Sequence, residues 1–348
     1  MTEKTTLVVT SISAPNAALR MLAEGCRQRD IDFIVIGDAA SPADFQLDGC
    51  RFYGLDEQRE LDLRVAQKCP TRSYARKNIG YLLAMRGGAT TLVETDDDNF
   101  PRAEFWSPRE RRQNARAISN GGWINIYRYF TDANIWPRGL PLDEVNSYGP
   151  SYDDLAPADT DCPIQLGLAD ENPDVDAIYR LVLPLPQSFR TDRRVALASN
   201  SWCPFNSQNT AWWREAFPLL YMPAYCSIRM TDIWRGFVAQ RIAWTNDWAV
   251  LFHEPTVWQE RNEHNLMRDF RDEVPGYLNN SSLSEALEKL DLKSGVENLN
   301  DNLQICYEQM VRMELVGAQE LDLLEAWISD MQQISSANES PVGAAAIS

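Results

Sequence analysis

An apolar strand that runs directly into three adjacent aspartates is the feature that most restricts how this chain can fold. Residues 92–99 read Leu-Val-Glu-Thr-Asp-Asp-Asp-Asn. Adjacent carboxylates repel one another, and leaving them unpaired at a buried strand end is costly. A divalent cation resolves this conflict, because Mg²⁺ and Mn²⁺ prefer carboxylate oxygen and keep positions open for water or a substrate phosphate. The triplet therefore indicates metal-assisted chemistry on a phosphorylated ligand.

The alternative interpretation of this triplet is a solvated acidic turn. The 348 residues include 50 Asp and Glu against 33 Lys and Arg, a formal net charge of −17, so acidic triplets can arise here without any special role. The same charge argues against nucleic acid or anionic membranes as general partners, because both require basic surface. An anionic small-molecule substrate remains compatible with the composition if cations gather locally.

Strands and helices alternate through the first hundred residues. Residues 5–11 and 33–36 are β-rich apolar runs, and helical spacing separates them at residues 18–26. A further helix is predicted over residues 72–86, just before the acidic strand. This alternation predicts an α/β protein with a mixed, mostly parallel sheet covered by helices on both faces.

Ligands of such sheets bind beyond the carboxyl ends of the strands. Ser13, Asp38 and residues 96–99 all fall at that edge. A carboxylate in the place of Asp38 can accept hydrogen bonds from a base or a ribose, as acidic residues do in other nucleotide-binding α/β folds. The local alternative for Asp38 is a turn-forming pair with Gly37.

Three cations, Arg72, Arg76 and Lys77, crowd the first turn of the predicted helix over 72–86. Positive charge there opposes the helix dipole by about 0.3–1 kcal/mol per residue at a typical surface site. The placement becomes favourable if an anion binds, because helix N-termini and arginine side chains both bind phosphate. The alternative is simple solvation or pairing with nearby acidic residues. With three aspartates one strand away, we favour phosphate binding.

A polar segment followed by aromatic residues predicts contact with a carbohydrate. Its short polar side chains are Asn206, Ser207, Gln208 and Asn209. Amides and hydroxyls beside aromatic surface suit a sugar, which offers hydroxyl groups at its edge and C–H groups on its faces. The following Trp212 and Trp213 are adjacent, however, and cannot share a face of any regular element. At least one of them therefore belongs to the core.

Asp232 lies at the start of a segment with helical spacing, in Thr231-Asp232-Ile233-Trp234-Arg235-Gly236. One interpretation makes Asp232 a general base, with Arg235 near a departing phosphate and Trp234 in contact with the substrate. The other makes Thr231 or Asp232 no more than a helix N-cap.

His253 and His264 are the only histidines in the chain. His253 follows the apolar strand over residues 248–252 and is a candidate late metal ligand. The alternative is a structural role, which is more common for a lone histidine.

The cysteines, the N-terminal residues and the lengths of the apolar runs indicate the expected cellular location. The seven cysteines are scattered and form no CxxC pair, so neither a zinc site nor a disulfide framework is indicated. The N-terminal residues lack the regions of a signal peptide, and no apolar run reaches membrane-spanning length. We therefore expect a cytoplasmic protein without an integral membrane segment, and an oligomer stays open.

Three segments are expected along the chain. Residues 1–278 form the α/β domain, 279–335 a helical appendage, and 336–348 a disordered tail. Ser282 with Glu285 resembles a capping box that starts the appendage. Residues 130–195, rich in Pro, Asp and Asn, are typical of a substrate loop, a lid or a disordered segment, and the choice stays open.

Several blocks in the same order resemble the STELLO glycosyltransferase family. They are residues 73–82 (Ser-Tyr-Ala-Arg-Lys-Asn-Ile-Gly-Tyr-Leu), 96–99, 206–210 (Asn-Ser-Gln-Asn-Thr), 214–217 (Arg-Glu-Ala-Phe) and 231–236. The resemblance covers roughly residues 5–260, which is more specific than an acidic triplet alone. It implies a GT-A (Rossmann-like) fold and a nucleotide-sugar donor. The plant members are membrane-anchored Golgi proteins linked to cellulose synthase, and we carry neither property over to this chain.

The resemblance implies a site for metal-dependent sugar transfer to a hydroxyl-bearing acceptor. Mn²⁺ or Mg²⁺ would be held by Asp98 with Asp96, and by His253 if a third protein ligand is needed. The expected donor-binding residues are Ser11, Ser13, Asp38, Arg72, Arg76, Lys77, Asp96 and Asp97. Asp232 would deprotonate the acceptor hydroxyl, which implies inversion of configuration. If Asp232 only caps a helix, a retaining mechanism stays open.

Three other functions compete with this one. A sugar-1-phosphate nucleotidyltransferase would share the sheet and the metal but usually has a Gly-rich, basic loop after the first strand, unlike residues 11–16. A sugar-nucleotide mutase or a self-glycosylating protein would use a similar acidic triplet. A non-catalytic scaffold on a transferase fold is the last alternative, against which the intact blocks argue.

Overall fold

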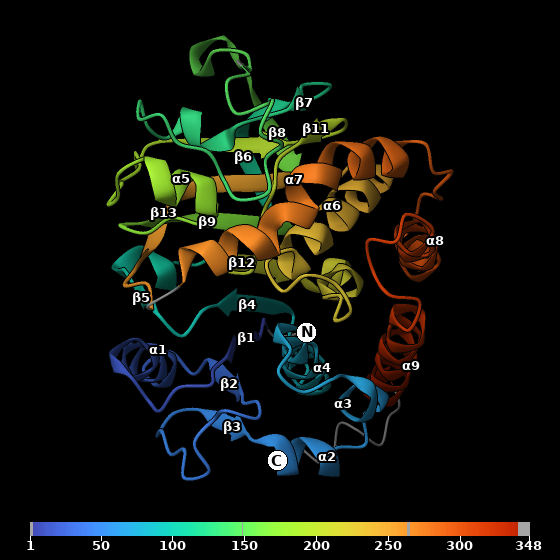
Figure 1. Ribbon diagram of the computed structural model, residues 1–348. Helices are drawn as coiled ribbons and strands as arrows, with labels where there is room; N and C mark the ends of the chain where they lie inside the picture. Colours follow the sequence, from blue (N-terminus) through green and yellow to red (C-terminus); the bar gives the residue numbers. More distant parts are fainter. Residues whose placement is uncertain (1–2, 148, 263–264, 340–348) are drawn as a thin grey trace.

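A single mixed sheet runs through the computed structural model, which describes residues 3–147, 149–262 and 265–339 (Figure 1). Eleven strands join it in the order β3-β2-β1-β4-β12-β9-β13-β10-β6-β8, with β5 paired to β13, and β7 and β11 form a separate pair. The strands are β1 Thr5–Thr10, β2 Asp32–Ile36, β3 Arg51–Tyr53, β4 Thr91–Thr95, β5 Asn99–Pro101, β6 Arg112–Ile118, β7 Gly122–Trp123, β8 Pro157–Asp161, β9 Ile164–Asp170, β10 Arg194–Leu197, β11 Ser201–Trp202, β12 Asn209–Trp213 and β13 Val250–Gln259.

Helices flank this sheet, and the C-terminal ones stack along one side of the molecule (Figure 1). They are α1 Ala17–Arg27, α2 Leu55–Glu60, α3 Arg64–Lys68, α4 Lys77–Arg86, α5 Ala177–Val182, α6 Thr231–Ala243, α7 Leu266–Glu288, α8 Leu299–Arg312 and α9 Glu320–Glu339. Among the described helices, none is long and apolar enough to cross a membrane.

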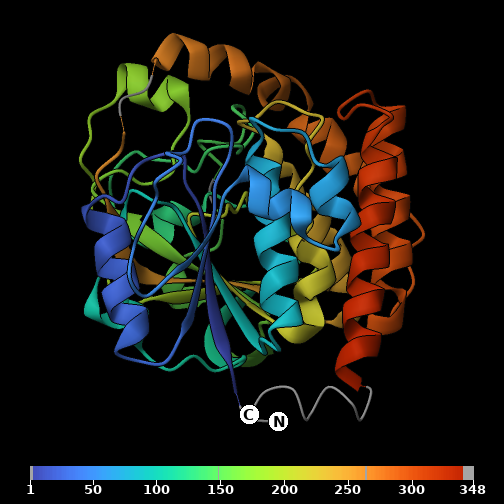
Figure 2. The same cartoon turned by 90° about the horizontal axis from the view of Figure 1, so that it is seen from below.

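The N-terminal part of the sheet is parallel and covered on both faces. β3, β2, β1 and β4 pair in parallel register. Along β1 the side chains alternate, so that Val8 joins the apolar core on one face and Leu7 and Val9 join the core on the other. Figure 2 shows α1 on one side of these strands and α4 on the other. The predicted α/β class with a mixed, mostly parallel sheet is therefore confirmed.

Helix α4 lies close to the sheet because it carries a glycine, Gly80, near its N-terminal end. A Cβ atom at Gly80 would stand 2.6 Å from Val8 Cγ1 and 2.9 Å from Ile36 Cγ1. Such contacts cannot form without a shift of the helix or the strands. The close approach holds the loop before α4 against the ends of β1 and β2, where the predicted nucleoside site lies.

The chain direction changes beside β4. β12 pairs antiparallel with β4 and also with β9, so Asn209 lies opposite Thr95. Residues 206–208, just before β12, therefore reach the end of β4 where the aspartates begin. Sequence spacing alone did not predict this pairing, because the two segments are more than a hundred residues apart.

The C-terminal helices depart in part from the expected segments. α7 is continuous from Leu266 to Glu288 and runs through the predicted boundary at residue 278, so Ser282 lies inside this helix and does not start one. α9 packs against α3 and α4 and extends to Glu339, past the predicted end of the appendage. The division into domains stays a prediction, and residues 340–348 of the expected tail lie outside the described residues.

Candidate functional site

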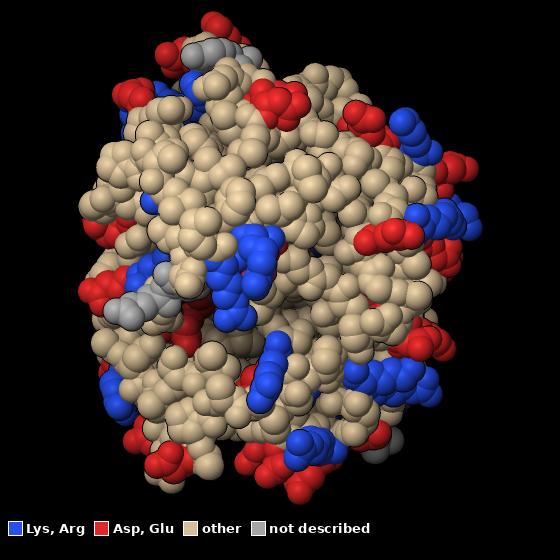
Figure 3. Space-filling view, in the orientation of Figure 1, with Lys and Arg blue, Asp and Glu red and all other residues tan. Residues whose placement is uncertain are grey.

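A cleft of about 640 Å³ opens at the carboxyl ends of β1, β2 and β4. Figure 3 shows Lys and Arg side chains gathered around a hollow near the centre of this face. One side of the cleft is an aspartate wall, which we define as Asp96, Asp97 and Asp98. The lining also includes an arginine wall, defined as Arg138, Arg180, Arg229, Arg261 and Arg268. The cleft lies at the sheet edge where the sequence predicted the ligand.

Each carboxylate of the aspartate wall is oriented by a different neighbour. Asp96 accepts a hydrogen bond from the Tyr74 hydroxyl (2.7 Å), Asp97 from the Ser11 hydroxyl (2.6 Å), and Asp98 from the Gln259 amide (2.9 Å). Ser11 lines the cleft, whereas Ser13 is not among the lining residues and contacts Ser11 through its backbone, whose N–H donates to the Ser11 Oγ at 3.1 Å. Specific hydrogen bonds therefore hold the three carboxylates, which do not form a freely solvated turn.

The pKa values of the three aspartates are all raised. Burial raises the pKa of Asp96 to about 6, and Asp98 adds to the rise, while Lys77 and the Tyr74 hydroxyl oppose it. Burial is also the main cause of the raised pKa of Asp97 and of Asp98. The local cations thus compensate these carboxylates only in part, and a further cation in the cleft would stabilise their charged forms.

Lys77 lies beneath the aspartate wall and does not line the cleft. Its side chain is fully buried, with Nζ donating to the Tyr74 hydroxyl (2.9 Å) and the Thr95 carbonyl (3.0 Å) and lying 3.8 Å from the Asp96 carboxylate. Contact with a donor phosphate, as predicted for Lys77, is therefore not supported by its position. Its charge is placed against the carboxylates of Asp96 and Glu94.

The other two predicted phosphate ligands, Arg72 and Arg76, both line the cleft. Arg72 lines the cleft, and its backbone N–H donates to Asp38, which also lines the cleft and holds the turn before α4. The Arg76 guanidinium donates to Gln58 Oε1 and to the Cys69 carbonyl. Gln58 in turn donates to the Gly37 carbonyl just after β2, so Arg76 lines the cleft with its guanidinium tied to the residues that hold this strand end.

Asp232 lies at the foot of the arginine wall, paired with Arg138. The two groups approach to 3.0 Å, and Arg138 also makes two parallel hydrogen bonds of 2.8 Å with Asp174. Burial alone would raise the pKa of Asp174, but the Arg138 guanidinium lowers it to about 2. The N-cap of α6 is Met230 and not Asp232, so the capping alternative does not describe this residue.

Of the four polar residues predicted to bind a sugar, only Gln208 lines the cleft. Asn206 donates to Asp174 (2.6 Å), and the Ser207 hydroxyl lies 2.7 Å from the Tyr74 hydroxyl. Asn209 is buried in the sheet, where it donates to the Gly167 carbonyl at 2.9 Å. Asn206 and Ser207 thus position cleft residues, and Asn209 holds strands together.

Arg235 and Trp234 are both in the core and away from the cleft. Arg235 is 1% exposed and pairs with Glu94 at 2.8 Å, with its guanidinium 5.0 Å from the centre of the Trp212 ring. The indole N–H of Trp234 donates to Asn280 at 2.9 Å. Neither residue reaches the cleft, so the structure does not place Arg235 near a departing phosphate or Trp234 against a sugar.

His253 is not brought to the aspartate wall. It lies early in β13, which β12 and β9 separate from β4, and its imidazole is 3.7 Å from Glu254. His264 lies outside the described residues. Within residues 3–147, 149–262 and 265–339, no three His, Cys, Asp or Glu side chains converge to form a metal ligand set.

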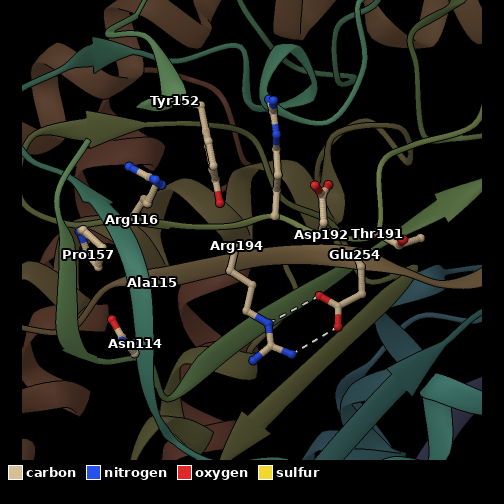
Figure 4. A pocket seen from close by; sticks show the side chains of 10 residues that line it. Asn114, Ala115, Arg116, Tyr152, Pro157, Thr191, Asp192, Arg194 and Glu254 are labelled. Carbon is tan, nitrogen blue, oxygen red and sulfur yellow. Dashed lines mark hydrogen bonds and ion pairs between the residues drawn. The ribbon is translucent and has the colours of Figure 1, made fainter. Parts of the chain in front are cut away.

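A smaller hollow of about 370 Å³ lies beside His253 (Figure 4). In it Arg194 pairs with Glu254 at 3.1 Å, and Arg116 and Arg193 lie 4.5 and 4.4 Å from the Tyr152 ring. None of the predicted site residues lines this hollow. The larger cleft is therefore the candidate active site.

Replacing His253 with glutamine should remove part of the acid sensitivity of the fold. Burial lowers the pKa of His253 from 6.5 to about 4, although Glu254 opposes this shift. The unfolded chain therefore takes up the proton first, and stability contributed by the neutral imidazole is lost as the pH falls from about 6.5 towards 4. Between pH 7 and pH 5, the free energy of unfolding of the native protein should fall by about 2 kcal/mol more than that of His253→Gln.

Urea titrations of both proteins at the two pH values measure this difference. Equal losses of unfolding free energy would show that His253 titrates in the folded protein as it does in the unfolded chain.

Sequence reasoning missed most of the arginine wall. Arg138 and Asp174 lie in the segment 130–195, whose irregular composition indicated a substrate loop among other options. Gln259, which orients Asp98, ends a strand at the same edge as the aspartates. For Arg180 there was no local signal, because its significance depends on residues far away in the sequence.

Comparison with known proteins gives concordant matches. A family model described as STELLO glycosyltransferases matches residues 229–343, a region that includes Asp232 and part of the arginine wall. The probable glycosyltransferase STELLO2 of Arabidopsis thaliana is 31% identical over 268 residues, and the probable glycosyltransferase STELLO1 of the same plant is 30% identical over 271 residues. These alignments cover 71% and 72% of this chain but 34% of each relative, so the chain spans about a third of their length.

Among solved structures, one described as the crystal structure of a mycobacterial protein matches with a TM-score of 0.41 and 11% identity. The match covers 80% of this chain and 75% of the mycobacterial chain.

Proposed function

Because this chain belongs to the STELLO glycosyltransferase family, we propose that it transfers a sugar from a nucleotide-sugar donor to a hydroxyl group of an acceptor. The observation that carries this proposal is the cleft itself. At the carboxyl edge of parallel strands, Asp38, the aspartate wall and the arginine wall line one space of about 640 Å³. That space has the size of a small-molecule site and offers groups for both a nucleoside and its phosphates.

The donor lies against the aspartate wall in this proposal. Asp38 and Ser11 border the nucleoside at the ends of β2 and β1, and Arg72 lies at the mouth on the same side. Asp96 and Asp98 would hold a divalent cation, Mn²⁺ or Mg²⁺, beside the donor phosphates. When bound, that cation stabilises negative charge on the diphosphate.

The residues present are suited to such a cation, although no third protein ligand is at hand. The donor atoms are carboxylate oxygens, which Mn²⁺ and Mg²⁺ prefer. The raised pKa values of Asp96 and Asp98 indicate that their negative charge is under-compensated. Since His253 is remote, the cation would be held by two carboxylates, which leaves several positions for phosphate oxygen and water.

Asp232 is the candidate general base for the acceptor. Its carboxylate lines the cleft, and the Arg138 guanidinium and the Ser207 backbone N–H fix its orientation. The acceptor oxygen forms a bond to the anomeric carbon as its proton passes to Asp232, and the bond from that carbon to the diphosphate oxygen breaks with its electron pair on the diphosphate. A single displacement of this kind inverts the configuration of the sugar.

Thermal melting with Mn²⁺ and a panel of UDP-, GDP-, ADP-, dTDP- and CMP-linked sugars tests this function. A ligand at about 100 times its dissociation constant adds roughly 2.7 kcal/mol of stability, which raises the melting temperature by a few degrees. We expect a rise with one nucleotide class, lost on adding a chelator. Mn²⁺ alone is the control.

The alternatives give different results in the same assay and in product analysis. No rise with any member of the panel, in protein shown to be folded, would favour a non-catalytic scaffold. A sugar-nucleotide mutase or a self-glycosylating protein would show the rise, but its product would be an isomerised donor or a glycosylated copy of the chain itself.

A further inference from the structure

Three arginines of the arginine wall are packed close enough to repel one another. Arg180 comes from α5, Arg229 from the loop before α6, and Arg261 from the segment between β13 and α7. We call them the arginine triad. Burial lowers the pKa of Arg180 to about 9, with Arg261 as the next cause, and burial followed by Arg229 lowers the pKa of Arg261. Like charges that are held together in this way favour an anion between them.

Only two members of the triad are matched by a carboxylate. Arg229 pairs with Glu273 at 2.8 Å, and Arg261 pairs with Asp269 at 2.8 Å. Arg180 forms no ion pair among the residues that the structure describes, and its guanidinium donates only to Asn172 (3.4 Å) and to the Pro173 carbonyl (2.9 Å). Its Nε is buried without a hydrogen-bond partner.

An unpartnered buried Nε is unusual for a guanidinium, because buried donors are normally satisfied. Asp174, whose charge acts on Arg180, is already bound by Arg138 and by Asn206. The charge of Arg180 is thus left for a group that enters the cleft, which Arg180, Arg229 and Arg261 all line.

We propose that the arginine triad binds a phosphate-class anion carried by the acceptor, so that the acceptor is a phosphorylated hydroxyl compound. This inference rests on the proposed sugar transfer. The planar guanidinium fork matches phosphate oxygen in pairs, which makes arginine the side chain suited to this anion.

The contacts of the triad link it to the candidate base. The donor diphosphate is assigned to Asp96 and Asp98 with their cation, whereas the Arg229 carbonyl accepts a hydrogen bond from Arg138, the partner of Asp232. Arg261 lies closer to the aspartates, because its neighbour Asn262 donates to Asp98 at 3.4 Å. An acceptor anchored at the triad by its phosphate would present a hydroxyl group toward Asp232. Anchoring of this kind raises the effective concentration of the hydroxyl at the reacting carbon.

Titration calorimetry with inorganic phosphate and, separately, with a nucleoside diphosphate plus Mn²⁺ tests the proposal. The variants are Arg180→Gln and Arg180→Lys, and the matched control is Arg193→Gln, an arginine in the smaller hollow (Figure 4). Phosphate should bind the native protein without Mn²⁺. Arg180→Gln should weaken this binding roughly tenfold or more, the effect of losing charge-assisted hydrogen bonds. Arg180→Lys should weaken it less, and Arg193→Gln should leave it unchanged.

The nucleoside diphosphate identifies the source of the anion. Unchanged affinity of Arg180→Gln for the nucleoside diphosphate, together with the loss of phosphate binding, would support an acceptor site. An equal loss for both probes would assign the triad to the donor diphosphate and overturn the proposal. It would also be overturned if native protein bound no phosphate, or if Arg180→Gln bound it as well as native protein.

These outcomes are separable from failure of the proposed function. If native protein bound no nucleotide sugar, the proposed sugar transfer would be ruled out, whatever the phosphate titration showed.

Discussion

Asp98→Asn is expected to lose metal-dependent donor binding while keeping its fold. The asparagine retains an oxygen that can accept the Gln259 hydrogen bond but loses the negative charge that a divalent cation requires. Replacing an outer-shell partner of a metal ligand typically costs about 10–100-fold in affinity, so removing a ligand should cost at least about 100-fold. Titration of Mn²⁺ with the responding nucleotide sugar measures this loss.

Two further variants sharpen this test. Asp159→Asn makes the same chemical change on exposed β8, where Asp159 pairs with Arg112, and should bind the donor as native protein does. Asp232→Asn should bind the donor normally but lose transfer, because an amide cannot take up the acceptor proton. Unchanged donor binding by Asp98→Asn would remove the metal assignment, and normal transfer by Asp232→Asn would remove the base.

Arg235→Met should destabilise the protein by about 3–5 kcal/mol, the usual cost of leaving one member of a buried ion pair alone. Glu94 is fully buried and accepts from Arg235 and from the Trp212 indole, both at 2.8 Å, and from the Tyr81 hydroxyl. Methionine fills much of the space of the arginine stem but leaves the carboxylate with Lys77, 4.0 Å away, in place of the close Arg235 ion pair. Urea unfolding measures the loss.

The matched control is Arg194→Met, which breaks a half-exposed ion pair with Glu254 and should cost less than about 1 kcal/mol. The double variant Glu94→Gln/Arg235→Met should recover part of the lost stability, because the unpaired charge is gone. If Arg235→Met were as stable as the control but inactive in transfer, the catalytic role expected from the sequence would be restored.

Two elements near the N-terminus could be predicted from the sequence almost to their ends. The run over 5–11 is β1, Thr5–Thr10, and the spacing over 18–26 is α1, Ala17–Arg27. The apolar pattern of each element is local, and burial on both faces reinforces it. The helix expected over 72–86 begins later, at Lys77 after a 3₁₀ turn, because Asp38 holds the backbone N–H of Arg72 and Ser73 in the preceding turn.

The C-terminal helices show where local signals fail. Residues 279–282 (Asn-Asn-Ser-Ser) resemble a helix start, yet they lie inside α7. There Asn280 accepts the indole N–H of Trp234 and donates to the Gly139 carbonyl, so its polar side chain is satisfied by distant residues. Tertiary hydrogen bonds thus replace the local ones that the pattern indicated.

What the sequence by itself determined is the order of strands and helices and the placement of three aspartates at a strand end. Both follow from the spacing of apolar residues and from where an apolar run stops, which are properties of neighbouring residues. What only the tertiary structure decided is the part that each charge plays. Lys77 and Arg235 became buried counter-charges, and Arg138, Arg180 and Arg261 met in one cleft. The reason is physical, since the role of a charge depends on burial and on partners that the chain brings together only when it folds.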